Sequence, residues 1–111
     1  MMTIHTNQLP WEPTPVTGVT VKELAHYSEG TAKLIRLAPG AEYPLHRHPQ
    51  RTEYVYVLAG TATLTVADDT HDAQAGDFTL MPAGTPHALA NYTTVEALLW
   101  VGAIMHGSQP E

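Results

Sequence analysis

Residues 40–60 of this chain read GAEYPLHRHPQRTEYVYVLAG, and this stretch decides the fold. The segment from Glu53 to Ala59 alternates with a period of two, which predicts a half-buried β-strand with valines on one face and tyrosines on the other. Gly60 predicts a tight turn directly after it, leading into a second strand over residues 61–67. The stretch is therefore typical of a strand–turn–strand unit.

Strand-like segments separated by turn residues continue on both sides of this unit. The nine prolines and eight glycines of the chain are spread along it, which favours many turns between short strands. No long segment shows helical periodicity. Further strands are expected over residues 19–28, 31–37, 78–81, 87–91 and 95–104. Short strands at regular spacing predict an all-β fold, either a sandwich or a closed barrel.

Length and composition limit the architecture to one domain. A chain of 111 residues with 43% hydrophobic residues can bury a single core. The chain has no cysteine, which excludes a disulfide scaffold, a zinc ribbon and a thiol nucleophile.

Charge narrows the range of partners. Five Lys and Arg against eleven Asp and Glu give a formal net charge of −6, so no basic face is available for nucleic acid or for an anionic membrane surface. Residues 1–10 lack the basic start and apolar run of a signal peptide, and no stretch approaches the roughly 20 apolar residues that cross a bilayer. We therefore expect a cytoplasmic protein whose ligand is a small molecule.

Histidine is the unusual component, with seven in the chain. His46 and His48 are two residues apart, so on an extended strand both side chains face the same way. Glu53 follows at an odd spacing, and a turn at residues 49–51 can return it to the histidine side. His87 begins a later strand. Spacing alone leaves open whether these four side chains form a metal site or are separate solvated groups.

Three imidazoles and one carboxylate would make a mixed nitrogen and oxygen ligand set. Such a set suits Fe, Mn, Zn, Ni, Co or Cu, and differs from the all-oxygen cages that Ca and Mg prefer. An octahedral ion with four protein ligands keeps two positions open for water, substrate or dioxygen.

Two longer patterns add a resemblance to a known family. Residues 40–60 match the first cupin motif, G-x5-H-x-H-x4-E-x6-G, and residues 76–91 match the second, G-x5-P-x-G-x2-H-x3-N, at every defined position. The chain thus resembles a small cupin, a double-stranded β-helix or jelly-roll barrel. The resemblance implies one divalent transition metal per chain, held by His46, His48, Glu53 and His87.

A looser resemblance concerns residues outside the two motifs. Residues 9–19, together with Thr31, Leu34, Arg36 and residues 39–44, are similar to the cupin domain of ChrR-type anti-sigma factors and related small dioxygenases. Because no N-terminal zinc-bearing helical domain accompanies the barrel, we expect no direct anti-sigma role.

Two classes of function stay open. The first is a metal-dependent oxygenase acting on a small metal-chelating molecule, such as a diketone or a hydroxylated aryl ketone. The second is a non-catalytic cupin that binds a metal or small ligand as a sensor. No catalytic residue beyond the metal ligands is assigned, although four side chains are candidates either for orienting a substrate or for packing: Tyr43, Tyr54, Tyr56 and Arg36.

The other polar and aromatic residues have simpler interpretations. Arg47 is expected to point away from the histidines that flank it, and Glu42 and Arg51 are expected to be solvated. Asn91 is expected to hydrogen-bond a turn. Four histidines have no partner at ligand spacing, with His71 placed in a polar loop: His5, His26, His71 and His106.

The chain divides into a proline-rich arm over residues 1–17, a single cupin barrel over 18–106 and a tail over 107–111. Trp11 and Trp100 are expected to be apolar anchors, with Trp11 packing on a neighbouring subunit. An extended arm and exposed barrel edges predict a homodimer.

Overall fold

The all-β prediction is confirmed in the computed structural model, which describes residues 2–107. Each strand expected from the sequence is present, with bounds that differ by at most a few residues. The elements are η1 (Thr6–Gln8), β1 (Glu12–Pro13), β2 (Val19–His26), β3 (Gly30–Leu37), β4 (Glu42–His46), β5 (Arg51–Ala59), β6 (Thr61–Val66), β7 (Asp69–Gln74), β8 (Phe78–Met81), β9 (His87–Ala90) and β10 (Ala97–Met105).

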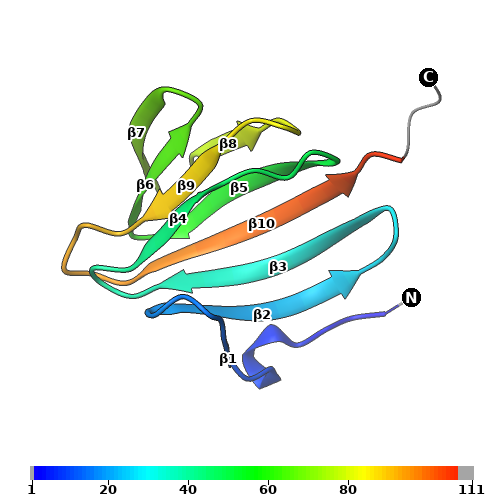
Figure 1. Cartoon of the computed structure of the whole chain (residues 1–111). Helices are drawn as coiled ribbons and strands as arrows, with labels where there is room; N and C mark the ends of the chain where they lie inside the picture. Colours follow the sequence, from blue (N-terminus) through cyan, green and yellow to red (C-terminus); the bar gives the residue numbers. More distant parts are fainter. Residues whose placement is uncertain (1, 108–111) are drawn as a thin grey trace.

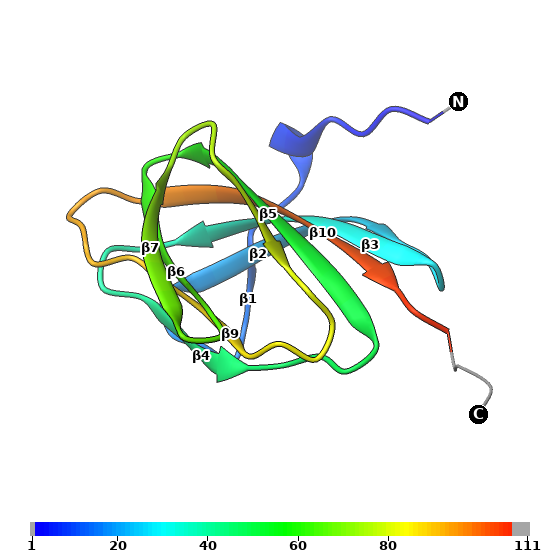
Figure 2. The same cartoon turned by 90° about the horizontal axis from the view of Figure 1, so that it is seen from above.

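The strands form two antiparallel sheets. The large sheet has the order β1-β2-β3-β10-β5-β8, and the small sheet has the order β4-β9-β6-β7. Figure 1 shows the long strands β2, β3 and β10 side by side in the large sheet, and Figure 2 shows the small sheet curving around one side of them. Neighbours in a sheet are often distant in sequence, such as β3 with β10, which is the arrangement of a jelly-roll barrel.

The core lies between the inner faces of the two sheets. The large sheet contributes Leu37, Val55 and Leu99, each fully buried, and the small sheet contributes Leu64 from β6. Burial of such apolar side chains is the main favourable term in folding. The barrel interior is therefore filled by side chains along most of its length.

The alternation predicted for β5 is confirmed. Val55 and Val57 are buried, at 0% and 1% exposed, whereas Tyr56 and Leu58 face outward at 39% and 42%. Glu53 shares the inner face with the valines and is only 5% exposed. A carboxylate on an otherwise apolar inner face needs a partner inside the barrel.

Three strands were not assigned from the sequence: the two-residue β1, β4 and β7. Residues 69–74 form β7, which pairs with β6 along its whole length, so the prediction that His71 lies in a loop is wrong. β7 is an edge strand of the small sheet, and within it only Ala73 is buried. An edge strand with one buried residue lacks the apolar alternation by which strands are recognised.

Two motif residues stabilise the turns at the end of the barrel away from the histidines. Gly60 has φ +75, and a Cβ there would lie 2.5 Å from the Glu96 carbonyl oxygen, so the turn after β5 requires glycine. Asn91 is fully buried and its amide donates to the carbonyls of Leu37 and Val95, at 3.0 and 2.9 Å. The turn-binding role expected for Asn91 is thus confirmed.

The N-terminal arm lies against its own barrel. β1 pairs with β2, and Trp11 packs under the cations of Lys22 and Arg36, with ring distances of 4.7 and 4.6 Å. Trp11 thus has contacts within its own chain, and its packing on a neighbouring subunit stays a prediction. Residue 1 of the arm and residues 108–111 of the tail lie outside the described residues.

The outer face of the large sheet carries exposed apolar side chains near its β8 edge. Phe78 and Leu80 are 61% and 47% exposed, and they lie opposite Tyr56 and Tyr54 of β5. The homodimer stays a prediction. Substitutions at Phe78 and Leu80 would test whether this face forms its interface. Among residues 2–107, no helix combines the length and hydropathy that crossing a bilayer demands.

Candidate metal centre

Both sheets contribute to one cluster of polar side chains at an end of the barrel. His46 ends β4 and lies directly opposite His87, the first residue of β9, in the small sheet. Glu53 projects from the inner face of β5 in the large sheet, and His48 lies two residues beyond β4. One ligand atom from each of these four residues can be chosen so that all lie within 4.8 Å of one another. The structure thus brings together all four residues that the motifs indicated.

The turn between β4 and β5 is what puts Glu53 on the histidine side. β4 ends before the turn at Pro49 and Gln50, and β5 starts immediately after it. Backbone hydrogen bonds hold this connection: the N–H of Gly84 donates to the carbonyl of His48 at 2.9 Å, and the N–H of His106 donates to that of Gln50. The turn predicted at this place is therefore present, and the loop before β9 packs against it.

Backbone carbonyls orient two of the imidazoles. Nδ1 of His46 lies 2.8 Å from the Pro44 carbonyl oxygen, and Nδ1 of His87 lies 3.1 Å from that of Thr85. Because a carbonyl oxygen only accepts, both Nδ1 atoms carry the proton and donate. Nε2 of each ring is then directed at the cluster, and a metal would take the place of the hydrogen between Nε2 of His87 and Glu53. A second contact of this kind is the usual way in which the orientation of a histidine ligand is fixed.

The distances within the cluster fit a transition-metal ion. Nε2 of His87 lies 3.0 Å from Oε1 of Glu53, and Nε2 of His48 lies 3.6 Å from the same oxygen. Two ligands about 2.1 Å from an ion and at right angles to each other are about 3.0 Å apart. The nitrogen and oxygen donors also suit Fe, Mn, Zn, Ni, Co or Cu. The cluster could therefore hold one such ion.

The local electrostatics favour the protonation states that a metal requires. Burial alone would raise the pKa of Glu53, but the hydrogen bond to His87 and the charge of Arg51 hold it below its ordinary value. Burial lowers the pKa of His46, and burial together with Arg51 lowers the pKa of His48. An ionised carboxylate and neutral imidazoles are the forms that coordinate metals.

Arg51 belongs to this cluster, so the prediction that it is solvated is wrong. Its Nη2 donates to Nε2 of His48 at 2.8 Å and lies 3.7 Å from Oε2 of Glu53. Its Nε is buried and has no hydrogen-bond partner among the described residues. The guanidinium thus occupies the lone pair of His48 that a metal would use. Glu42 is exposed, as expected, and so is Arg47.

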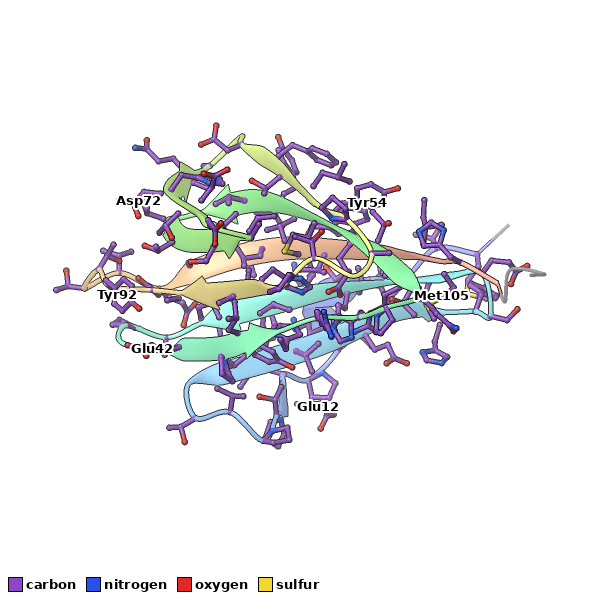
Figure 3. All side chains as sticks on the ribbon, turned by 45° about the horizontal axis from the view of Figure 1, so that its top comes forward. Glu12, Glu42, Tyr54, Asp72, Tyr92 and Met105 are labelled. Carbon is purple, nitrogen blue, oxygen red and sulfur yellow. The ribbon has the colours of Figure 1, made fainter. Side chains whose placement is uncertain are left out.

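The cluster is reached from one end of the barrel. His48, Arg51 and Met105 line an open pocket there, and Figure 3 shows Met105 at the opposite end of the molecule from Tyr92. Further inside lies a narrower cavity of about 90 Å³ between the two sheets. Its walls are mainly apolar, and the polar lining residues are Thr14, Lys33, Tyr43 and Glu53. The apolar lining residues are Val19, Val21, Ile35, Met81, Leu89 and Val101.

The four side chains named from the sequence as candidates for substrate contact differ in their position relative to the cavity. Tyr43 lines it, whereas Tyr54 stacks on Phe78 outside the barrel, with ring centroids 5.7 Å apart. Tyr56 is on the same outer face as Tyr54. Arg36 donates to Thr20 and packs on the indole of the arm. Of the four, only Tyr43 is placed to meet a ligand in the cavity.

Lys33 is a lining residue that sequence reasoning missed. The signal was present in the segment 31–37, because Lys33 shares the odd-numbered face with Ile35 and Leu37, both of which are buried. Recognising it required knowing that this face points into the barrel beside Glu53.

The other histidines lie outside the cluster. His26 is an exposed neighbour of Glu23, and His71 is hydrogen-bonded to the Thr79 hydroxyl at 3.2 Å. Nε2 of His106 lies 2.8 Å from the hydroxyl of Thr52 on the surface, and His5 precedes η1. Within residues 2–107, one group of three or more histidine and acidic side chains is close enough to share an ion, and it consists of His46, His48, Glu53 and His87.

Comparisons with known proteins agree with this architecture. The cupin domain family model matches residues 33–102, well over half of the chain. Oxalate decarboxylase OxdC from Bacillus subtilis is 38% identical over 77 residues, covering 64% of this chain and 20% of that protein. The chain spans between 12% and 44% of the length of the curated relatives it matches.

Solved structures share the fold at low sequence identity. A predicted oxalate decarboxylase from Thermotoga maritima superposes with a TM-score of 0.88 at 19% identity, covering 94% of this chain and 99% of that one. The polyketide cyclase RemF from Streptomyces resistomycificus has a TM-score of 0.83 at 20% identity, covering 100% of this chain and 88% of that one. At these identities the likeness concerns the fold, and a fold of this kind hosts many activities.

Proposed function

This chain belongs to the cupin family, and on that premise we propose that it is a metal-dependent oxygenase. Its substrate is a small organic molecule that chelates the metal through oxygen atoms, such as a diketone or a hydroxylated aryl ketone. The observation that carries the proposal is the convergence of His46, His48, Glu53 and His87 on one centre beside the cavity. A bound transition metal supplies Lewis acidity and redox chemistry at that centre.

The residues of the chain perform the remaining tasks. The four side chains would hold the ion and would leave room on it for a further ligand. The apolar walls formed by Ile35, Leu89 and Val101 exclude water from the carbon skeleton of the substrate, which strengthens polar interactions inside the cavity. The phenol of Tyr43 provides a hydrogen-bonding group at the same place. These features support a site that binds, desolvates and orients a small chelating molecule.

A second candidate is a non-catalytic cupin that senses a metal or small ligand, related to the ChrR-type regulators. The observation that favours it is the composition of the cavity. Among the described residues that line it, Glu53, Lys33 and Tyr43 are the titratable ones, and the first of these already belongs to the metal cluster. An acid–base group separate from the metal ligands is thus limited to a lysine or a tyrosine.

Oxygen consumption by the metal-loaded protein distinguishes the two candidates. The iron-loaded protein is supplied with β-diketones and phenolic ketones, and dissolved oxygen is followed with an electrode. Loss of one dioxygen molecule per substrate supports the oxygenase. Oxalate serves as a further probe, with carbon dioxide release as the readout, because the OxdC relative carries that activity in its name. Tight binding of a panel member with no turnover of any contradicts the oxygenase and supports the sensor.

A further inference from the structure

Lys33 places an amine inside the barrel. It lies in β3 opposite Val101 of β10, which in turn lies opposite Val55 of β5. Val101 and Val55 are 3% and 0% exposed, so this row of side chains is on the inner face of the large sheet. Lys33 accordingly lines the same cavity as Glu53 and Tyr43. Its side chain is directed toward the place where a ligand would sit.

Lys33 has no hydrogen-bond or ion-pair partner among residues 2–107, although the exposed Glu23 of β2 lies opposite it in the sheet. By contrast, Lys22 donates to the Thr6 carbonyl at 2.9 Å. Glu53, the carboxylate in the same cavity, is already engaged by His87 and Arg51. Lys33 is half-buried and lines the cavity. Its ammonium group is therefore available to a ligand that enters the cavity.

The sheet register gives the scale of the gap between Lys33 and the metal cluster. Glu53 lies opposite Ala103 of β10, and Ala103 lies opposite Thr31 of β3. Lys33 follows Thr31 by two residues on the same face of β3. Glu53 and Lys33 are therefore separated by two strand spacings across the sheet and by two residues along it. This corresponds to about 10 Å across the sheet and about 7 Å along the strands between their backbones. Both side chains extend into the same cavity, which shortens the gap. A ligand with a few heavy atoms could touch the cluster and the lysine together.

We propose that Lys33 binds a carboxylate of the metal-chelating molecule, so that the preferred ligand is a small keto acid rather than a neutral diketone. The inference rests on the proposed function, because it assumes that the ligand is anchored at the metal cluster. A lysine ammonium offers three donors to a carboxylate, and apolar walls keep water from weakening the contact. The chain has a net charge of −6, so an anionic ligand needs a local cation of this kind.

A matched pair of ligands tests the proposal. Pentane-2,4-dione and 2,4-dioxopentanoate differ in one group, a methyl in the first and a carboxylate in the second. Their dissociation constants are measured by isothermal titration calorimetry on zinc-loaded protein, in which no oxidation occurs. The wild-type protein is expected to bind the acid about 10- to 100-fold more tightly than the dione, the range of a charge-assisted hydrogen bond. Lys33→Met should lose this preference while keeping its affinity for the dione.

Two further variants serve as controls. Lys33→Arg keeps a cation and should retain most of the preference. Arg47→Met removes an equal charge from an exposed position outside the cavity and should bind both probes as the wild type does. Zinc content and the unfolding temperature are measured for each protein, and Lys33→Gln replaces Lys33→Met if the latter does not fold.

The outcomes separate this inference from the proposed function. Equal affinity of the wild type for the two probes, or an undiminished preference for the acid in Lys33→Met, overturns the role of Lys33 and leaves the chelating site standing. If zinc-loaded wild-type protein binds neither probe, the chelating site itself is contradicted, and the role of Lys33 is contradicted with it.

Discussion

Glu53 and His87 are buried, at 5% and 2% exposed, whereas the side chain of His48 is 30% exposed and His46 is also only partly covered, although the four point to one centre. The buried pair is joined by a 3.0 Å hydrogen bond between a strand of the large sheet and one of the small sheet. The open pair comes from the end of β4 and the loop after it. The comparison shows that Glu53 and His87 are part of the core, whereas His46 and His48 lie nearer the surface.

The largest expected effect is a difference in the free energy of unfolding between a variant of the buried pair and a variant of the open pair. In metal-free protein, Glu53→Ala leaves Nε2 of His87 buried without its acceptor and should lower the free energy of unfolding by about 2–4 kcal/mol. His48→Ala removes a partly exposed ring and should cost under about 1 kcal/mol. Urea denaturation in the presence of a chelator measures both, since the chelator removes the stabilisation that a bound metal adds. Equal losses would mean that the two pairs are energetically alike.

Replacing Arg51 is expected to have the next largest effect, which acts mainly through His48. Its Nη2 donates to the lone pair of His48 that a metal needs, and its positive charge repels a cation. Arg51→Met should therefore raise metal affinity, by about tenfold if one such hydrogen bond is removed. Competition with a chromophoric chelator measures the change, with Arg47→Met as the control. Weaker metal binding in Arg51→Met would show instead that the guanidinium helps to assemble the ligands.

A smaller effect is expected from pH. Burial lowers the pKa of His46 and His48, so the unfolded chain binds more protons than the folded one between those lowered values and about 6.5. This contribution to stability is complete above about pH 6.5 and is lost as pH falls through the folded values. The double variant His46→Gln, His48→Gln should show a shallower fall in metal-free unfolding free energy below pH 6.5. Parallel curves for variant and wild type would contradict this assignment.

The sequence predicted the parts of the site that depend on local pattern. The alternation from Glu53 to Ala59 placed that carboxylate on the valine face, and the proline after His48 indicated the turn that brings it to the histidines. That His46 lies opposite His87 followed from the resemblance and not from spacing, because the pairing of β4 with β9 joins residues far apart in the chain.

The misses have a common physical cause. Arg51 follows a turn and looked solvated, yet the same turn folds its guanidinium back onto His48. Lys33 sits in a loosely alternating segment, and its inward direction is evident only from the register of β3 with β10. β7 is polar because it lies at an edge. For Lys33 and β7 the deciding contacts are between strands, and for Arg51 the deciding contact is across a turn. The pattern of residues along a single strand contains neither kind of contact.

The central claim is that the buried and the open pair hold a single ion together. Metal analysis of the purified and reconstituted protein by mass spectrometry tests this most directly. The account predicts close to one transition-metal ion per chain in the wild type, and loss of most of it in both His48→Ala and Glu53→Ala. Full retention of the metal by both variants would contradict the four-residue site.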